Sequence, residues 1–418
     1  MALVMEYSLL STPIFFFTAL ALVLSIFTVS VLKRKLIKSN KKYPPIAGTQ
    51  LHQLRNFNRL HDYMTDLAAK HKTYRLLGLF RSEIYTSDPA NVEYILKSNF
   101  DNYGKGWYNY NILRDLLGDG IFAVDGEKWR QQRKISSHEF STKMLRDFSS
   151  VIFQKGAAKL AYKLSEIATS NQTIEIQDVF MKLALDSIFQ VAFGTALGNM
   201  CESGEEGKSF GDAFDNSSAL TLFRYMERED ILSRFLQVNQ TDPTYLRDII
   251  LNFVIAGKDT TATTLTWFMY LLCKHPSVQE KISQEVEQVT DMKKITNFSE
   301  FASSLSEDVL EKMQYLHAAI TETLRIYPAV PVDGKMCFSD DTLPDGFSVR
   351  KGTLVAYQPY AMGRMKTLWG DDAEQFKPER WLDENGVFQP ESPFKFKAFQ
   401  VRLACPFVLK THLSSQYI

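Results

Sequence analysis

The feature that most constrains this 418-residue chain is an uncharged stretch close to its N-terminus. Residues 12–32 hold no charged side chain, and a membrane-spanning helix needs roughly 20 such apolar residues. The segment before the stretch carries one charge, Glu6, whereas residues 33–35 are all basic. Positive charge stays on the cytosolic side, so we expect residues 1–11 to be luminal, residues 12–32 to be a single-pass anchor and the rest to be cytosolic.

A cleaved signal peptide is the competing interpretation of this stretch. Its apolar region would span about 7–15 residues, behind a basic start and before a small-residue cleavage site, and the stretch has none of these features. Residues 33–50 follow as a basic and proline-rich linker. Pro44 and Pro45 stiffen the exit from the membrane and Gly48 permits a turn, although a plain linker would also account for them.

Composition excludes some classes of function. The formal net charge is 0, whereas a nucleic-acid partner calls for a basic stripe. Hydrophobic residues make up 45% of the chain, which is enough for a large apolar core. Neither a zinc site nor a disulfide framework is indicated, because the cysteines are far apart and form no C-x-x-C pair, and a reducing, cytosol-facing compartment fits them best. They are Cys201, Cys273, Cys337 and Cys405.

Helical patterns dominate the chain after the linker. Short strand-like pieces lie at residues 73–86 and 346–358, and the second is expected to be a hairpin around a basic turn. An acidic, glycine-rich segment at residues 199–216 is expected to be a loop, and residues 343–393 are expected to meander. Residues 51–418 are therefore predicted to form one mainly α domain with a small β portion. The expected helices are residues 51–71, 89–98, 126–140, 142–168, 177–193, 243–275, 276–290 and 308–326.

The first candidate site lies on a helix that is predicted to cross the core. Apolar residues flank the sequence AGKDTT at positions 256–261 on both sides. A glycine inside a helix costs about 1 kcal/mol relative to alanine, so Gly257 needs a reason, and small residues here would let a flat cofactor approach the backbone. Asp259 with Thr260 or Thr261 forms an acid–alcohol pair that could relay protons to a bound oxygen species. Close helix packing with satisfied hydroxyls is the alternative that the sequence leaves open.

Two further pairs are placed at helical spacing. Glu322 and Arg325 share one helix face at i, i+3, and Arg380 would complete a buried network with them. Trp129 and Arg133 share a face at i, i+4, where an indole N–H beside a guanidinium can hold a carboxylate. Taken singly, both pairs are also what an ordinary surface helix contains.

Together these motifs occur in one fixed order. An anchor and a proline hinge are followed by four motifs, in the order W-x-x-x-R, A-G-x-[DE]-T-T, E-x-x-R and P-E-R-[FW]. With its motifs in this order, the chain resembles a microsomal cytochrome P450 over nearly its whole length. The stretches NFVIAGKDTTATTLTWF, YPAVPVDGK and PYAMGRMKTLWGDDAEQFKPERWL are similar to the plant branch that hydroxylates fatty acids at the chain end. The resemblance implies the mainly α P450 fold and a haem-thiolate monooxygenase that acts with O2 on a fatty acid or a similar apolar chain.

The resemblance also implies a cofactor, partners and a location. The cofactor would be haem b, with electrons passed from NADPH through NADPH-cytochrome P450 reductase, and the location would be the endoplasmic reticulum membrane. The iron ligand would be a cysteine thiolate, which favours O–O cleavage. The resemblance implies that Trp129 and Arg133 bind the haem propionates. It implies that the oxygen-binding groove is lined by Ala256, Gly257, Asp259 and Thr260, with Thr260 in the proton relay. It also implies a structural triad behind the haem, formed by Glu322, Arg325 and Arg380.

The ligand loop departs from the family pattern, F-x-x-G-x-R-x-C-x-G. It starts well at Phe399, but Cys405 lies one place early. Without the glycines that aim backbone N–H groups at the sulfur, Cys405 is a weak candidate for the iron ligand, and an ordinary cysteine in a novel tail is the competing interpretation. The positions of the first glycine, the arginine, the cysteine and the last glycine hold Arg402, Ala404, Pro406 and Val408.

Two stretches are also shorter than the resemblance predicts. The region near residues 199–240 is too short for the two lid helices that the family places over its substrate, and the fold is expected to be incomplete after residue 400. A splice variant or a mispredicted gene product would explain both. The chain thus has two leading functional hypotheses, a haem monooxygenase or a catalytically inactive, haem-poor membrane-anchored variant. A single-pass interaction protein without a cofactor is a more distant third.

Overall fold

The chain divides into two units, Met1–Tyr43 and Pro44–Ile418. The computed structural model describes residues 41–78, 82–139, 143–194, 197–198, 209–215, 243–290 and 297–398. The predicted anchor at residues 12–32 lies outside these ranges, and so do Cys405 and its loop. Of the helices in the described ranges, none is both long enough and apolar enough to cross a membrane.

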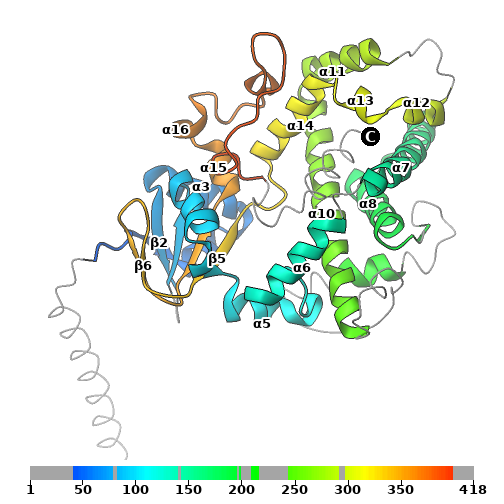
Figure 1. Cartoon of the computed structure of the whole chain (residues 1–418). Coiled ribbons are helices and arrows are strands. Elements are labelled where there is room, and N and C mark those ends of the chain that lie inside the picture. The colour runs from blue at the N-terminus through cyan, green and yellow to red at the C-terminus, as the bar shows by residue number, and fades with distance from the viewer. Residues whose placement is uncertain are drawn as a thin grey trace, which may run out of the picture. The chain divides into compact units, whose positions relative to one another are not determined.

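A six-stranded mixed sheet gathers segments from both ends of the second unit (Figure 1). β2 and β3 pair antiparallel with Thr73 opposite Thr86, and β3 pairs parallel with β8 with Glu83 opposite Leu354. The predicted strand region 73–86 is therefore β2 and β3, joined to a strand from far along the chain. The strand order is β1 (Ile46–Thr49), β2 (Thr73–Leu77), β3 (Ser82–Thr86), β8 (Leu354–Tyr357), β5 (Asp333–Cys337) and β4 (Tyr103–Gly104).

The hairpin expected within residues 346–358 is wrong. A turn forms there, with the Thr353 N–H donating to Arg350 O at 3.0 Å, but the strands on its two sides belong to different sheets. β7 (Ser348–Val349) pairs with β6 (Asp341–Thr342), whereas β8 pairs with β3 and β5. The Gly352 N–H donates to Cys337 O at 2.7 Å, so the turn is bonded to the end of β5 instead of closing a ladder of its own.

Helices make up most of the remainder, and several of their ends follow capping rules. Asp88 caps α4 by accepting from the Ala90 N–H at 2.9 Å, and Asn297 caps α12 by accepting from the Glu300 N–H at 2.9 Å. Gly194 ends α8 in the left-handed conformation. The main helices are α2 (Gln50–Arg55), α3 (Leu60–Lys70), α4 (Pro89–Glu93), α5 (Gly106–Leu117), α6 (Gly126–Glu139), α7 (Lys143–Ser170), α8 (Ile176–Phe193), α10 (Pro243–Lys274), α11 (Pro276–Val289), α12 (Phe298–Ser304), α13 (Glu307–Leu310), α14 (Gln314–Ile326), α15 (Pro359–Arg364) and α16 (Lys366–Trp369).

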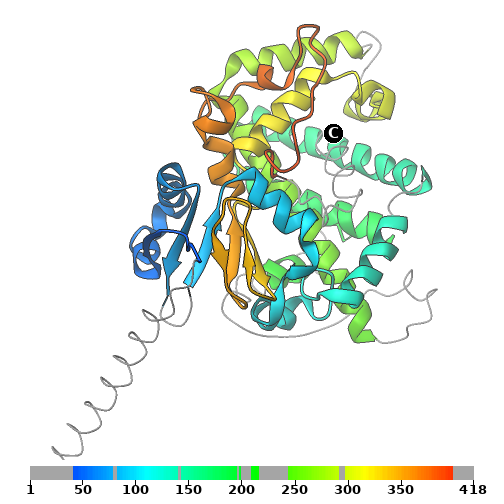
Figure 2. The same cartoon turned by 60° about the vertical axis from the view of Figure 1, so that its left-hand side comes forward.

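The long helix α10 runs between the sheet on one side and α7 and α8 on the other (Figures 1 and 2). It packs against α8 through a buried apolar cluster that contains Ile188, Ile250 and Val254. The fold is therefore mainly helical with a small mixed sheet, as predicted. Its helical core is centred on the segment that carries the AGKDTT sequence.

The loop expected at residues 199–216 is wrong for its last part, because residues 209–215 are helical. Phe210 and Phe214 stand at i, i+4 and give this short helix an apolar face. Phe210 lies against Phe189 of α8, with ring centroids 5.1 Å apart. Two aromatic side chains thus outweigh the acidic and glycine-rich composition around them.

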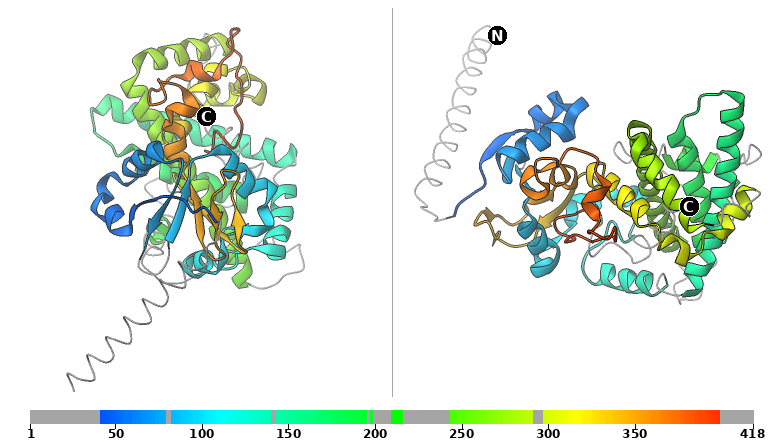
Figure 3. Two further views of the ribbon diagram at one scale, coloured as in Figure 1. Left: turned by 90° about the vertical axis from the view of Figure 1, so that its left-hand side faces the viewer. Right: turned by 90° about the horizontal axis from the view of Figure 1, so that it is seen from above.

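The second central helix, α14, is buried at every residue from Ala318 to Ile326. The segments that follow it in the chain, expected to meander at residues 343–393, do so only in part. They contain α15, α16 and the helical turn η6 (Pro378–Trp381), and these lie close to α14 (Figure 3). This arrangement brings the E-x-x-R and P-E-R-W sequences together.

Candidate functional site

Glu322, Arg325 and Arg380 meet in a buried ion network between α14 and η6. Arg325 donates from Nε to Glu322 Oε2 and from Nη2 to Glu322 Oε1, both at 2.7 Å, and neither side chain is exposed. Arg380 approaches Glu322 Oε1 with its Nε at 3.4 Å. The structure therefore brings together the three residues that the sequence analysis grouped as a triad.

Further groups of the protein complete this network. The Trp381 indole N–H donates to Glu322 Oε2 at 2.8 Å, and the Lys377 backbone N–H donates to Glu322 Oε1 at 3.0 Å. A buried ion pair is tolerated only where such additional hydrogen bonds satisfy its charge. Arg325 also donates to the backbone carbonyls of Gly363, Ala373 and Gln375.

The AGKDTT segment lies in the middle of α10. Thr260 Oγ1 donates to Ala256 O at 2.6 Å, so the hydroxyl is held against the helix backbone. Burial raises the pKa of Asp259, and the Lys258 ammonium, 3.5 Å from Asp259 Oδ1, opposes the rise. Burial thus favours the protonated form of Asp259, and the next residue carries a hydroxyl, which are the two kinds of group that a proton relay uses.

Gly257 lies on the side of α10 that faces α8. A Cβ added there would stand 2.8 Å from Ile188 Cδ1, so the absence of a side chain lets the two helices approach closely. Lys258, which the sequence analysis did not single out, is 2% exposed and donates to Asp215 of the short helix at residues 209–215. Both residues tie α10 to its neighbours.

Trp129 and Arg133 lie one turn apart on α6. Trp129 is 8% exposed, with the Phe100 ring centroid 5.3 Å from its own and the Lys105 ammonium 5.6 Å from its ring. The Trp129 Nε1–H is buried and reaches no acceptor within the described ranges. A buried donor left in this way costs about 1–3 kcal/mol, which points to an acceptor outside the described residues, such as a bound ligand.

Hydrogen bonds tie α6 to α10 through the loop between α5 and α6. Asp248 Oδ2, on α10, accepts from the Asp119 N–H at 2.8 Å, and Asn252 Oδ1 accepts from the Phe122 N–H at 2.9 Å. On the α6 side, Gln132 Nε2 donates to Asp119 O at 2.7 Å. The helix of the W-x-x-x-R pair is thereby fixed to the helix of the AGKDTT segment.

Three more buried lysines, besides Lys258, were missed by sequence reasoning. Lys105 is 7% exposed, Lys335 is 6% exposed and Lys397 is 4% exposed. Burial lowers the pKa of Lys105 to about 7 and that of Lys397 to about 8, and the positive charge of Lys335 contributes to both shifts. They come from three distant segments, so no spacing in the sequence could have found them.

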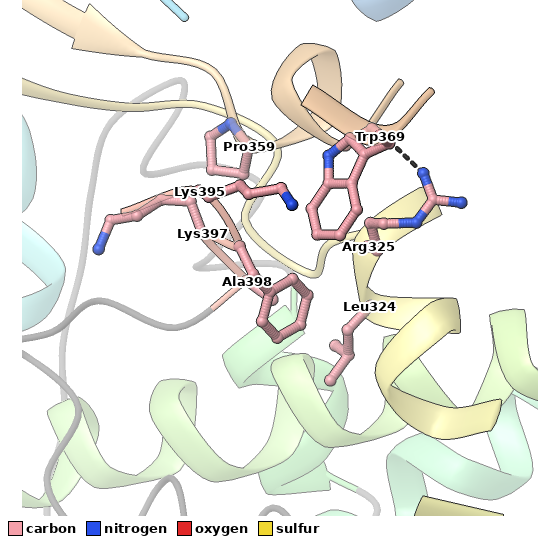
Figure 4. Close-up of a pocket in the computed structure, with 9 residues that line it drawn as sticks. Leu324, Arg325, Pro359, Trp369, Lys395, Lys397 and Ala398 are labelled. Carbon is pink, nitrogen blue, oxygen red and sulfur yellow. Dashed lines mark hydrogen bonds between the residues drawn. The ribbon is translucent and has the colours of Figure 1, made fainter. Parts of the chain in front are cut away.

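A small hollow lies beside the triad, between α14, α15 and residues 395–398 (Figure 4). In it Lys395 and Lys397 leave the same stretch of chain in different directions. The Lys395 ammonium lies 4.4 Å from the centre of the Trp369 ring, whereas that of Lys397 lies 5.7 Å from the ring of Tyr357 in β8. The candidate ligand loop continues from this point, outside the described residues.

The fold is mainly helical, and its central helix α10 carries an acid–alcohol pair. Helix α6, which is bonded to α10 through the preceding loop, carries a tryptophan beside a buried lysine. These features point to an enzyme that works with a bound cofactor. Residues 42–237 and 223–400 match the family model described as Cytochrome P450. The chain belongs to the cytochrome P450 family. By that membership it is a monooxygenase of a family that uses a haem-thiolate cofactor and generally works with a reductase on apolar substrates.

Several plant proteins are similar to the chain. It is 46% identical to "Cytochrome P450 704C1" of Pinus taeda, over 92% of this chain and 86% of that protein. It is 39% identical to "Cytochrome P450 704B1" of Arabidopsis thaliana, over 87% and 84%, and 34% identical to "Cytochrome P450 94A1" of Vicia sativa, over 86% and 79%. The pine alignment extends over 447 residues, more than the 418 of this chain, so the pine protein has internal residues without a counterpart here.

The described residues fit the carboxylate edge of a haem. The Trp129 Nε1–H is an orphaned buried donor, and the ammonium of Lys105 lies next to the same ring. A hydrogen-bond donor beside a buried cation is the combination that binds a carboxylate strongly.

Proposed function

We propose that this chain is built as a membrane-anchored monooxygenase that inserts one oxygen atom into an apolar chain, such as that of a fatty acid. The observation that carries the proposal is the connection between α6 and α10, which fixes the carboxylate-binding pair Trp129 and Arg133 to the helix of Asp259 and Thr260. The similarity to plant relatives across most of their length supports the family activity.

In this proposal each residue has a defined task. Trp129 and Arg133 would bind the propionates of the cofactor. Ala256 would line the groove beside it, and Gly257 would do so as well, if the cofactor shares the side of α10 on which Gly257 packs against Ile188 of α8. Asp259 and Thr260 would supply a carboxyl group and a hydroxyl group for moving a proton along this side of α10. When bound, the haem supplies the activation of O2. The triad of Glu322, Arg325 and Arg380 holds the elements around α14 in place.

The proposed setting follows from the N-terminal sequence and the family. Residues 12–32 would anchor the protein in the endoplasmic reticulum membrane with a single pass, residues 1–11 would be luminal, and residues 33–50 would link the anchor to a cytosolic domain. NADPH would supply electrons through NADPH-cytochrome P450 reductase. The lipid bilayer would then supply the apolar substrate as well as the anchorage.

A second candidate is a catalytically inactive, haem-poor variant of such an enzyme. The loop at residues 399–408 favours it, because Cys405 is displaced and both glycines of the pattern are replaced. The excess length of the pine alignment is consistent with lid helices that are shortened near residues 199–240. A transcript with an alternative exon encoding the intact loop would support origin as a splice variant or mispredicted gene product, and the absence of any such exon would refute it.

The reduced, CO-bound absorption spectrum of the purified full chain separates the two candidates. A Soret band of the thiolate type is expected for the monooxygenase, and a lack of haem absorbance would exclude it. Cys405→Ser then tests the ligand. Loss of the thiolate-type band identifies Cys405 as the ligand, whereas an unchanged band excludes it.

A further inference from the structure

Lys258 occupies the position that the pattern A-G-x-[DE]-T-T leaves open, next to the acid–alcohol pair of α10. Its side chain is 2% exposed, although a buried ammonium is costly unless it is paired. Two carboxylates lie beside it, because the ammonium donates to Asp215 Oδ1 and lies 3.5 Å from Asp259 Oδ1. Lys258 is therefore shared between an acid outside α10 and the acid of the candidate proton relay.

The short helix beside α8 carries Asp215 to this point. Phe214, one residue earlier, is 3% exposed, and the Lys258 ammonium lies 5.6 Å from the centre of its ring. Gly211 lets the short helix approach α8 closely, because a Cβ added there would stand 3.3 Å from Leu185 Cδ2. Apolar packing of this helix thus places Asp215 within reach of Lys258.

The two charges beside Asp259 act on it in opposite directions. Burial raises the pKa of the Asp259 carboxyl, the Lys258 ammonium lowers it and the Asp215 carboxylate raises it. An ammonium that is bonded to Asp215 stabilises the charged form of Asp259 less than one that turns fully toward it. Helix α8, which packs against the same part of α10, adds one further buried charged residue, Asp186. The protonation of Asp259 therefore depends on the ion pair beside it.

We infer that Lys258 is a positioning residue for the acid of the relay, and that Asp215 controls it by drawing the Lys258 ammonium toward itself. While Asp215 holds the ammonium, the Asp259 carboxyl, whose side chain is 35% exposed, can exchange a proton with water. Without Asp215 the ammonium turns to Asp259 and keeps it as a carboxylate. The inference rests on the proposed function for the use of Asp259 in proton transfer, but the contacts that carry it lie within the protein.

The test measures how the stability of the full chain in detergent depends on pH. Free energies of unfolding in urea are compared between the wild type and Asp259→Asn from about pH 4 to about pH 8. The difference isolates Asp259, because the titration of Asp186 and of other groups cancels. Folded Asp259 keeps its proton to higher pH than the unfolded chain does, so the difference should fall as the pH rises and level off above the folded pKa.

Variants of the ion pair should move the pH at which this fall ends, each measured against its own double mutant with Asp259→Asn. Asp215→Asn should move it to lower pH, because the released ammonium stabilises the Asp259 carboxylate. Lys258→Met should move it to higher pH, because burial and Asp215 both favour the protonated form. Lys258→Arg keeps the positive charge and should move it less than Lys258→Met does. The control Asp212→Asn removes an exposed carboxylate of the same short helix and should leave it in place.

A merely structural ion pair would lower stability in both variants without moving the end of the fall, whereas the inference requires shifts of opposite sign. The Asp215 side chain is 55% exposed, so Asp215→Asn is expected to fold even if Lys258→Met does not, and circular dichroism checks each variant. A profile of Asp215→Asn that stays in place or moves to higher pH overturns the inference. A folded Lys258→Met whose profile does not move to higher pH overturns it as well.

The result is separable from that of the proposed activity, because unfolding profiles need neither haem nor turnover. A missing Soret band of the thiolate type would refute the monooxygenase and leave the pH profiles valid. Conversely, a normal spectrum together with an unmoved profile in Asp215→Asn would refute the role of Lys258 alone.

Discussion

Two buried clusters of charged residues differ in how fully hydrogen bonds and ion pairs within the protein satisfy their charges. Around Glu322, each oxygen of the carboxylate accepts hydrogen bonds from Arg325 and from further donors, and Arg325 is also bonded to backbone carbonyls. Around Asp333, Lys335 lies 3.3 Å from the carboxylate, and burial lowers the pKa of Lys105 to about 7 and that of Lys397 to about 8. The first cluster satisfies its charge with its own hydrogen bonds, whereas in the second burial disfavours the charged form of two lysines.

The largest effect should come from breaking the cluster around Glu322. Glu322→Ala leaves Arg325 buried and without its carboxylate, and we expect it to lower the free energy of unfolding by about 3–5 kcal/mol, measured by urea denaturation. The matched control is Glu93→Ala, which removes an exposed ion pair to Lys97 and should cost no more than about 1 kcal/mol. Equal losses in the two variants would contradict the structural role of the triad.

The opposite sign is expected in the lysine cluster. In the cofactor-free chain, Lys397→Met replaces a buried cation with an apolar side chain of similar length, and should raise the free energy of unfolding by about 1 kcal/mol. Lys395→Met removes a contact to Glu391 and the contact of the ammonium with the Trp369 ring, and should lower it by about 1 kcal/mol or less. Destabilisation by Lys397→Met would mean that Asp333 and its neighbours already balance this charge.

The same contrast predicts a dependence on pH. The folded chain gives up the proton of Lys105 near pH 7, whereas the unfolded chain keeps it until about pH 10.5, because burial and the charge of Lys335 outweigh the attraction of Asp125 and Asp333. The unfolded state binds more protons between these values, so Lys105 makes stability rise with pH across the interval. Urea midpoints between pH 7 and 9 should rise less in Lys105→Met than in the wild type, with the exposed Lys97→Met as control. Parallel pH profiles for Lys105→Met and the wild type would show that Lys105 titrates normally.

Sequence reasoning found the parts of the site that lie within one helix and also grouped Arg380 with Glu322 and Arg325, but it missed the lysines that come from several segments. Trp129 with Arg133 and Glu322 with Arg325 follow from helical spacing, and the long helix of Ala256 follows from its apolar flanks. The lysine cluster joins three segments with no common period, and the expected hairpin fails because Gly352 bonds to the end of β5. Local patterns reveal faces of helices, but partners are decided by tertiary contacts.

Gly257 is the position where sequence left two explanations open, and the smallest predicted effect addresses it. The added Cβ of Gly257→Ala would stand 2.8 Å from Ile188 Cδ1, the far end of a flexible side chain. Overpacking of about 1–2 kcal/mol is partly offset by the gain of about 1 kcal/mol for alanine over glycine inside a helix, so we expect a net loss below about 1 kcal/mol in urea denaturation. Ile188→Val removes that methyl group and should recover much of the loss when the two substitutions are combined, which a double-mutant cycle measures as coupling. Additive losses, together with a weaker affinity of Gly257→Ala for protoporphyrin IX, would instead mean that the glycine makes room for the cofactor and not for α8.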